Sequence, residues 1–600
     1  KAAAKATYGR KGEDVVMKNW AAIDAGAKGV HKVEVPASWA NCEDEGLDYK
    51  VVTEGRKEVV DFVNNIQTKV SAQEGNTLPV SAFKDYVDGS TPSGSSAYEK
   101  RGIAVKVPVW NVDNCIQCNF CSYVCPHAVI RPVAMTAEEA AKAPADMKMK
   151  DMTGMPGYKF SMAISALDCT GCGSCANVCP GMKGNKALEM KPLEASLSEQ
   201  ANYDFAETLP VKEEVIAKFK ENTVKGSQFK KPLLEFSGAC AGCGETPYAK
   251  LITQLFGDRM YIANATGCSS IWGNSSPSTP YTMNAKGQGP AWDNSLFEDN
   301  AEFGYGMLLA QNAIRDGLKS KVESVMANEN ASEEVKAACK EWLDTYAVGA
   351  LNGTATDKLV AALDGIDCPT CKEIVANKDF LAKKSQWIFG GDGWAYDIGF
   401  GGVDHVLASG RDINVMVFDT EVYSNTGGQS SKSTPTGAIA QFAAGGKETK
   451  KKDMASIAMS YGYVYVAQIS MGADFNQTVK AIAEAEAYPG PSLIIAYAPC
   501  INHGIKKGMA KAQTEEELAV KCGYWHNFRF NPAADKKFAL DSKTPDMENY
   551  MDFLNGEVRY NSLQRQNPEK AARLFAKNES EAKARYAYLN KLVAMYGEEE

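Results

Sequence analysis

The sequence lacks a long hydrophobic run. No stretch of 18 uncharged apolar residues occurs among its 600 residues, which excludes an ordinary transmembrane helix. No signal-peptide pattern opens the printed sequence. Basic residues are fewer than acidic ones, 65 against 74, so the formal net charge is -9. This balance argues against a general binder of nucleic acid or anionic membranes, because both functions need a basic surface.

Motifs for common nucleotide cofactors are also missing. The sequence has no G-x-G-x-x-G followed by a ribose-binding acid and no Walker P-loop, which disfavours a dinucleotide site. Hydrophobic residues are plentiful at 44%, which excludes global disorder. At this length we expect about three to five domains.

Cysteine, in contrast, is abundant. Seventeen is an odd number, and most of the cysteines stand in tight groups separated by two or three residues. Disulfide frameworks belong mostly to small secreted domains, whereas large intracellular enzymes use such groups for metal or redox chemistry. We therefore expect a cytoplasmic protein. Because the sequence begins with Lys1 and opens in what reads as the middle of a domain, we also expect a fragment.

Four regions follow one another along the chain. Residues 1–40 contain a predicted helix from Lys11 to Ala25 and a predicted strand from Val30 to Val35, which we interpret as the tail of an upstream domain. Residues 41–97 are predicted to be a small helical region with a linker, because 89–96 contain only Gly, Ser, Thr and Pro, a composition typical of flexible connections. The cysteine groups dominate residues 98–214. A fourth domain is expected over 215–600.

The fourth region alternates short apolar runs with helical patterns. This alternation predicts an α/β fold, an open sheet with helices on both faces. Residues 315–385 are predicted to be mostly helical, and 567–597 to form a charged amphipathic helix. The predicted buried strands are Met260–Ala263, Trp387–Phe389, Ile413–Phe418, Val464–Ile469 and Leu493–Tyr497.

Two cysteine runs match the bacterial pattern for [4Fe–4S] ligation, C-x2-C-x2-C-x3-C-P. In two-cluster proteins the fourth cysteine of each run binds the other cluster. We therefore assign one cluster to Cys115, Cys118, Cys121 and Cys179, and a second to Cys169, Cys172, Cys175 and Cys125. Zinc also accepts four cysteines, but its sites rarely show this spacing with a following proline, and almost never twice. The nearby His127 is interpreted as a surface or packing residue.

A third group of cysteines has two interpretations. Ligands gather at the carboxyl ends of strands in open α/β sheets, and Cys268 and Cys500 each follow a predicted strand. A second CxxC, Cys368 and Cys371, falls in the helical insertion. We favour a third [4Fe–4S] site, and the alternative is a set of buried free thiols. The ligands of that site would be Cys240, Cys243, Cys268 and Cys500.

A glycine-rich turn follows the strand at 387–389. Together with Asn425 after the next strand, its Gly-Asp-Gly resembles the thiamine diphosphate signature. A diphosphate needs close backbone N–H groups, and Mg²⁺ needs hard oxygen ligands. Asp392 supplies a carboxylate, Thr420 a hydroxyl and Val422 a carbonyl. The alternative for such a glycine-rich turn is an ordinary loop.

Taken together, these motifs resemble the C-terminal half of the pyruvate:ferredoxin (flavodoxin) oxidoreductase family. The resemblance rests on the double ferredoxin motif and on residues 238–247, 266–270, 391–399 and 420–428. It implies that the third cluster is the one nearest the thiamine, that Glu245 and Cys268 touch the cofactor, and that Asn425 is catalytic. It also implies that the diphosphate and its Mg²⁺ are bound by Gly391, Asp392, Gly393, Trp394, Thr420, Glu421, Val422, Tyr423, Ser424 and Asn425.

The resemblance further implies oxidative decarboxylation of pyruvate with coenzyme A to acetyl-CoA and CO2. Electrons would pass from thiamine diphosphate through three [4Fe–4S] clusters to ferredoxin or flavodoxin. The main pyruvate and coenzyme A contacts would lie in a missing N-terminal half, in a homodimeric enzyme. Alternatives are another 2-oxoacid:ferredoxin oxidoreductase, a non-catalytic iron–sulfur electron-transfer subunit, or a zinc-binding structural protein. The five remaining cysteines are expected to be free thiols, namely Cys42, Cys339, Cys368, Cys371 and Cys522.

Overall fold

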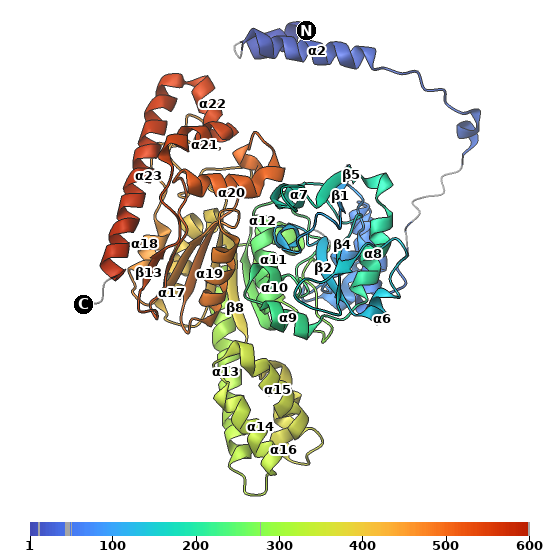
Figure 1. The fold of residues 1–600 in the computed structure, drawn as a ribbon, viewed down its shortest axis with the longest axis vertical. Helices are drawn as coiled ribbons and strands as arrows, with labels where there is room; N and C mark the ends of the chain where they lie inside the picture. Colours follow the sequence, from blue (N-terminus) through green and yellow to red (C-terminus); the bar gives the residue numbers. More distant parts are fainter. Residues whose placement is uncertain (10–11, 43–48, 50, 276–277, 598–600) are drawn as a thin grey trace. The chain divides into compact units, whose positions relative to one another are not determined.

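A computed structural model describes residues 1–9, 12–42, 49, 51–275 and 278–597 (Figure 1). Within these residues the chain forms two compact units, Lys1–Val51 and Val52–Glu600. Lys11 and residues 43–48 and 50, which belong to predicted segments, lie outside the described residues. None of the described helices is both long and apolar enough to cross a membrane.

The first unit is helical. It contains α1 (Ala2–Tyr8), α2 (Glu13–Lys28) and a 3-10 turn at Ala37–Asn41. Helix α2 confirms the helix predicted up to Ala25. The strand predicted from Val30 to Val35 is wrong, because this stretch is irregular and its three valines are exposed. A strand needs a neighbouring strand to pair its backbone N–H and C=O groups, and the described part of this unit contains none.

A large sheet organises the second unit. The strand order is β13-β12-β10-β11-β9-β8-β6-β7, with β7, β6, β8, β9, β11 and β10 parallel and β12 and β13 antiparallel at one edge. The five predicted strands are confirmed as β6 (Met260–Ala265), β8 (Ser385–Gly391), β9 (Asn414–Asp419), β10 (Tyr465–Ile469) and β11 (Ser492–Tyr497). The strands that were not predicted are β7 (Ala291–Ser295), β12 (Phe528–Phe530) and β13 (Phe538–Leu540).

Helices cover both faces of the sheet, as predicted. Alternate strand residues point to opposite faces, so Val415 and Val417 join one core while Met416 and Phe418 join the other. The first core is covered by α17 (Phe400–Ala408), α18 (Met454–Met459), α20 (Ala512–Lys521), α21 (Tyr550–Gly556), α22 (Val558–Gln566) and α23 (Pro568–Gly597). The second is covered by α10 (Val224–Ser227), α11 (Thr246–Phe256) and α19 (Phe475–Ala487). Helix α23 confirms the predicted helix near the end of the chain.

The cysteine-rich region forms its own small sheets. Strand β1 (Lys106–Trp110) pairs antiparallel with β5 (Leu188–Pro192). A second sheet has the order β2-β4-β3, built from β2 (Ile130–Met135), β4 (Lys159–Ile164) and β3 (Lys150–Asp151). Short helices α5 (Phe120–Tyr123) and α7 (Ser174–Val178) lie within the two cysteine runs. The remaining helices here are α6 (Ala137–Ala140), α8 (Ser198–Glu207) and α9 (Glu213–Phe219).

Residues 52–98 contain short helical elements, and the end of the stretch predicted as a flexible connection, 89–96, is buried. The segment contains α3 (Lys57–Phe62), a π-helical turn at Val63–Gln67 and α4 (Thr68–Ser71). Ser95 and Ser96 are buried. The Ser96 hydroxyl donates to the Glu235 carbonyl at 2.9 Å, and the Thr279 N–H donates to the Ser95 hydroxyl at 2.9 Å. The expectation of flexibility is therefore wrong at these serines, because distant backbone groups order them.

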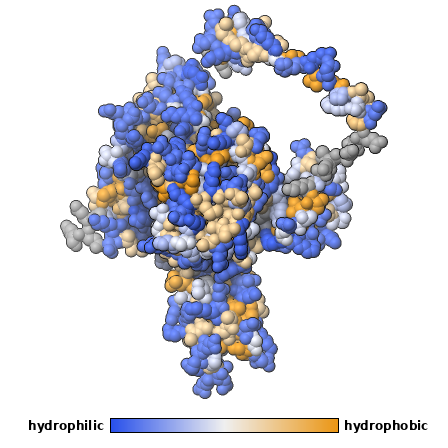
Figure 2. All heavy atoms as spheres, turned by 45° about the vertical axis from the view of Figure 1, so that its right-hand side comes forward, coloured by the Kyte–Doolittle hydropathy of each residue, from blue (hydrophilic) through white to orange (hydrophobic). Residues whose placement is uncertain are grey.

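A helical subdomain is inserted between β7 and β8. It consists of α13 (Asn300–Met326), α14 (Glu333–Asp344), α15 (Gly349–Leu363) and α16 (Pro369–Ala376), which confirms the helical prediction for 315–385. Figure 1 shows this subdomain projecting away from the sheet. In Figure 2 hydrophilic side chains predominate on the face shown, and apolar ones form scattered patches. The subdomain has a core of its own, which includes Val322, Trp342, Leu359 and Ile374.

This separate core allows a local stability test. Replacing the fully buried Leu359 with alanine leaves a cavity, so the subdomain should lose about 2–5 kcal/mol of stability. Hydrogen–deuterium exchange should rise in peptides from 315–384 and stay unchanged in β8 and β9. The matched control is Leu351→Ala in the same helix, where the leucine is exposed. Equal exchange in both variants would contradict an independent core.

Candidate functional site

The candidate cofactor residues lie at the carboxyl ends of parallel strands. Cys268 follows β6, Asp392 follows β8, Thr420 follows β9 and Cys500 follows β11. The register pairs Gly391 with Phe418 and Asp419 with Tyr497. Because these strands are parallel and in register, the segments that follow them meet at one edge of the sheet.

Three oxygen donors meet at this edge. An Asp392 carboxylate oxygen lies 3.0 Å from the Thr420 hydroxyl, which lies 3.0 Å from the Val422 carbonyl. Burial raises the pKa of Asp392, and the neighbouring Asp419 carboxylate raises it further. A divalent cation would offset the charge of these two carboxylates. A carboxylate, a hydroxyl and a carbonyl are the hard ligands that Mg²⁺ prefers, so this donor set fits it.

The glycines beside Asp392 have different surroundings. A Cβ at position 393 would lie 2.3 Å from the Tyr423 ring, so only glycine lets the two segments approach this closely. At Gly391 the nearest atom to a Cβ would be the Phe418 carbonyl oxygen, 3.8 Å away, so there is open space beside this residue. Trp394 packs into the core. Open space next to the oxygen donors suits a diphosphate.

The predicted segment after β9 divides into a buried and an exposed part. Glu421 is buried and pairs with Lys451 at 2.9 Å and Arg559 at 2.8 Å. Burial alone would raise the pKa of Glu421, but Lys451 and Arg559 outweigh it and lower the pKa to about 2. Glu421 is thus an ionised structural carboxylate. Asn425 is exposed in the turn after Ser424, apart from the buried donors.

Glu245 and Cys268 lie at the same edge. Glu245 is buried at the start of α11, and the Trp272 indole N–H donates to it at 2.8 Å. Burial raises the pKa of Glu245 to about 7. The Cys268 sulfur lies 3.3 Å from the Ser424 hydroxyl, and that hydroxyl lies 3.3 Å from the Thr420 hydroxyl. Ser424 therefore links a cysteine of the third group to the oxygen donors.

The third cysteine group gathers around this link. A Cβ at Gly244 would lie 2.6 Å from the Pro499 nitrogen, so glycine lets the Cys243 loop approach the Cys500 segment. Burial raises the pKa of Cys500 to about 12, and the charges of Glu245 and Cys240 add to the rise. Burial likewise raises the pKa of Cys268, with contributions from Glu245, Cys243 and Cys500. The four cysteines predicted for the third cluster thus lie on loops of the same region, within electrostatic range of one another.

The two ferredoxin-type groups are also assembled across the runs. Burial raises the pKa of Cys121, and the thiols of Cys118, Cys115 and Cys179 add to it. These four cysteines line one cavity, together with Met162 and Ile116. In the other group, burial raises the pKa of Cys175, and Cys172, Cys125, Cys121 and Cys169 add to it. Each run therefore places its fourth cysteine beside the other run's first three.

Among the described residues, no three His, Cys, Asp or Glu side chains converge closely enough to hold a single metal ion. A [4Fe–4S] cube holds its thiolates at four separate corners, and four cysteines around one cavity match that chemistry.

His127 is a residue whose role the sequence did not indicate. It is buried, which confirms the packing interpretation and excludes the surface one. Its Nε2 lies 2.9 Å from the Ala239 carbonyl, its Nδ1 lies 3.4 Å from the Thr170 hydroxyl, and its own carbonyl accepts from the Phe236 N–H at 2.9 Å. Ala239 precedes Cys240 and Thr170 follows Cys169. One imidazole therefore joins the loops of two cysteine groups. The position of His127 directly after Cys125-Pro126 was the only feature of the sequence that could have indicated this role.

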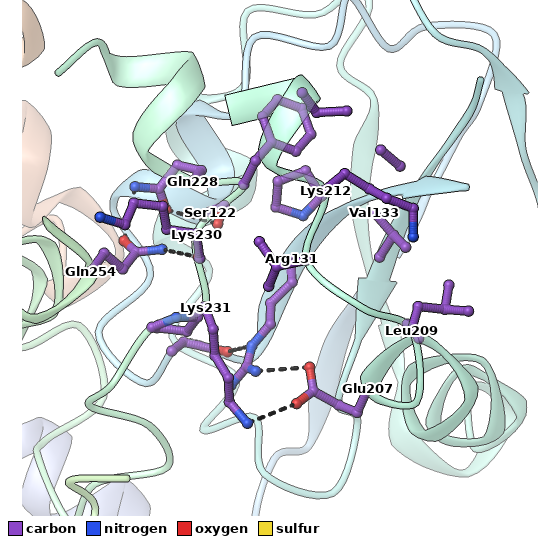
Figure 3. Close-up of a pocket in the computed structure, with 18 of the residues that line it drawn as sticks. Ser122, Arg131, Val133, Glu207, Leu209, Lys212, Gln228, Lys230, Lys231 and Gln254 are labelled. Carbon is purple, nitrogen blue, oxygen red and sulfur yellow. Dashed lines mark hydrogen bonds and ion pairs between the residues drawn. The ribbon is translucent and has the colours of Figure 1, made fainter. Parts of the chain in front are cut away.

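Lys250 makes a second connection between the cysteine-rich region and the sheet. It is buried in α11, donates to the Ser122 carbonyl and lies 3.1 Å from the Gln228 side-chain oxygen. Burial lowers the pKa of Lys250 to about 8, while Cys125 and Cys121 favour its charged form. The adjoining pocket is shown in Figure 3, where Arg131 and Glu207 point toward one another and pair at 2.8 Å. These charged side chains of the pocket are thus paired with other groups of the protein.

Comparisons with known proteins agree with both cofactor motifs. Residues 114–184 match a 4Fe-4S dicluster domain, and 375–496 match the C-terminal TPP binding domain of thiamine pyrophosphate enzymes. Residues 50–104 match EKR, a domain of unknown function.

Curated relatives extend the match along nearly the whole chain. Pyruvate-flavodoxin oxidoreductase from Enterobacter agglomerans is 54% identical over 98% of this chain and 50% of its own length. Pyruvate:ferredoxin oxidoreductase from Moorella thermoacetica has the same identity and coverage. The chain is a relative of these pyruvate oxidoreductases. The predicted resemblance is thereby confirmed, and the chain spans about half the length of the curated relatives it matches.

Two further similarities are more distant. The mitochondrial NADP-dependent pyruvate dehydrogenase of Euglena gracilis is 46% identical over 94% of this chain and 31% of its own length. A solved 2-oxoglutarate:ferredoxin oxidoreductase from Magnetococcus marinus has 15% identity and a TM-score of 0.25, covering 44% of this chain and 65% of that one. This structural likeness is too weak to carry an argument.

The oxygen donors generate one prediction. Asp392→Asn keeps the shape of the side chain but removes the negative charge that favours Mg²⁺. Binding of thiamine diphosphate in the presence of Mg²⁺, measured by calorimetry, should weaken at least about 100-fold, since bound metal is needed to offset the diphosphate charge. Asp535→Asn, an exposed carboxylate elsewhere, is the control. Unchanged affinity in Asp392→Asn would remove this residue from the metal site.

The position of His127 between two cysteine loops generates a second prediction. His127→Phe keeps an aromatic ring but loses the bonds to Ala239 and Thr170, so the loops of the two groups should separate. In the iron-loaded protein, the magnetic interaction between reduced clusters in EPR spectra should weaken, while His127→Gln should restore part of it through its amide N–H. The control is His526→Phe, another buried histidine, which stacks on Tyr586. Identical spectra for both phenylalanine variants would contradict a linking role.

Proposed function

We propose that this chain is the cofactor-carrying, C-terminal half of a cytoplasmic pyruvate:ferredoxin or pyruvate:flavodoxin oxidoreductase. The complete enzyme would convert pyruvate and coenzyme A to acetyl-CoA and CO2. Residues 98–214 would hold two [4Fe–4S] clusters, and 215–600 would hold thiamine diphosphate, Mg²⁺ and a third cluster. The names of the curated relatives support pyruvate as substrate and ferredoxin or flavodoxin as acceptor.

One observation carries this proposal. The Ser424 hydroxyl lies 3.3 Å from both the Thr420 hydroxyl and the Cys268 sulfur. When bound, thiamine diphosphate supplies the electron sink that lets a 2-oxoacid lose carbon dioxide. Asp392, Thr420 and Val422 would hold its Mg²⁺ beside the third cysteine group, so electrons would leave next to their first acceptor.

The backbone around the cysteines supports an onward path. The Gly242 N–H bonds to the Cys172 sulfur, which brings the loop of the third group against the second group. Cys121 of the first group in turn raises the pKa of Cys175 in the second group through its charge. These interactions support electron transfer in the order third group, second group, first group. A purely electron-carrying subunit would have no use for the oxygen donors, which makes that alternative weaker.

Exposed apolar side chains support a missing partner segment. Leu296 and Phe297 follow β7, Ile398 lies in the turn after Asp392, and Phe442 lies near the turn after Ser424, and all four are strongly exposed. The Glu298 carbonyl lies against Gly399, so the first two of these segments adjoin. Exposed apolar groups at such an edge mark contact surfaces. We propose that the remaining half of the enzyme, within a homodimer, covers this edge and supplies the main pyruvate and coenzyme A contacts.

The cluster count can be tested by composition. Anaerobically purified, fully loaded protein should contain about twelve irons from three four-iron clusters. Cys500→Ala should lower this to about eight and remove one EPR signal. Cys522→Ala, a buried cysteine outside the three groups, should keep twelve. A wild-type content of eight would eliminate the third cluster.

The activity needs the complete enzyme. With the remaining half present, pyruvate should reduce ferredoxin or flavodoxin only when coenzyme A is added. The test against other 2-oxoacid oxidoreductases is a panel of 2-oxoacids under the same conditions. Faster turnover of 2-oxoglutarate than of pyruvate would overturn the proposed substrate but leave the cofactor sites intact.

A further inference from the structure

The CxxC of the helical subdomain is a feature that the proposed function does not use. Cys368 and Cys371 flank Pro369 and Thr370 at the start of α16. The subdomain has its own core, and neither cysteine belongs to the three groups described above. The oxygen donors and cysteines of the cofactor sites come from other segments, so this pair needs its own explanation.

The two thiols have different surroundings. Cys368 is the N-cap of α16 and is only partly buried, whereas Cys371 is 3% exposed. The Cys371 N–H donates to the Cys368 sulfur at 3.4 Å. The first turn of the helix therefore holds the two residues together and directs a backbone donor at the outer sulfur.

This local geometry favours the thiolate form of Cys368. Its pKa is lowered by hydrogen bonds from the Cys371 side chain and backbone. Burial raises the pKa of Cys371 to about 11, and the Cys368 and Cys339 thiols add to the rise. The thiolate form is thus favoured at the partly exposed sulfur and disfavoured at the buried one, an asymmetry typical of redox-active CxxC pairs.

Cys371 faces the core of the subdomain, whereas Cys368 lies toward its surface. Cys371 packs in the core with Ile374 and Cys339. On the outer side, the adjacent charges Asp367 and Lys372 pair with one another at 2.5 Å. An incoming molecule can therefore reach Cys368 from solvent but cannot reach Cys371 directly.

We propose that Cys368 and Cys371 form a redox-active dithiol that exchanges with disulfides of low-molecular-weight thiols. The Cys368 thiolate attacks one sulfur of the external disulfide, forms a mixed disulfide and releases one thiolate. Cys371 then loses its proton and attacks the Cys368 sulfur, which forms the internal disulfide and releases the second thiol. The protein loses two electrons and the external disulfide gains two. This activity does not depend on the proposed pyruvate chemistry.

Glutathione disulfide is a suitable probe. The iron-loaded protein is equilibrated anaerobically in glutathione buffers of increasing oxidation, blocked with an alkylating reagent and digested with trypsin. The tryptic peptide 359–372 contains both cysteines and no other. It should lose two hydrogen atoms in one two-electron transition. In reduced protein, Cys368 should be alkylated at least about tenfold faster than the buried Cys339.

Serine variants separate the two steps. Cys371→Ser should trap glutathione on Cys368, because the second attack is lost, whereas Cys368→Ser should leave Cys371 unmodified. Cys522→Ser, which removes a buried thiol elsewhere, should behave as wild type. The proposal is overturned if wild-type peptide 359–372 never forms the internal disulfide, if glutathione stays attached to it, or if Cys371 pairs with Cys339. Hydrogen–deuterium exchange of 315–384 verifies that the serine variants remain folded.

Discussion

The shared direction of four strands is the constraint on which the candidate site depends. Strands β6, β8, β9 and β11 are parallel, and each is followed within three residues by a cysteine, a carboxylate or a hydroxyl that the site uses. Their side chains are far apart in sequence, so only the sheet brings them together. A reversed strand would move its donor to the opposite edge. The direction of these strands therefore determines which chemistry can occur at one place.

Burial makes the thiols of the cysteine groups hard to ionise. A buried thiol is costly to ionise, and the raised pKa values of Cys121, Cys175 and Cys268 express this cost. Iron–sulfur ligation requires the thiolate, so insertion of the proposed clusters would be coupled energetically to folding. Buried polar side chains strengthen the same assembly, since His127 joins two cysteine loops and Lys250 joins α11 to the first cysteine run. The proposed clusters and the contacts between segments would thus depend on one another.

Local patterns predicted more of this structure than long-range contacts did. Apolar runs identified all five central strands, because strands buried on both faces are continuously hydrophobic. Strands β7, β12 and β13, which lie toward the two ends of the sheet, were not predicted, since β7 is partly polar and β12 and β13 have only three residues each. The burial of Ser95 and the linking role of His127 were not predicted for a different reason: their hydrogen-bond partners lie 184 and 112 residues away in the chain. The cysteine spacing fixed the ferredoxin-type grouping, whereas the contact between Ser424 and Cys268 needed the folded sheet.

The inserted helical subdomain also affects the order in which the strands can pair. Strand β6 ends at Ala265, and its inner neighbour β8 begins only at Ser385. During synthesis on the ribosome, β6 therefore keeps one edge unpaired until the whole helical subdomain has emerged. The helices have mostly local contacts and can form first, since local contacts form faster than distant strand pairs. In the nascent protein the helical subdomain can thus fold while the sheet is still incomplete. The unpaired edge of β6 is then the place where a chaperone would protect the chain.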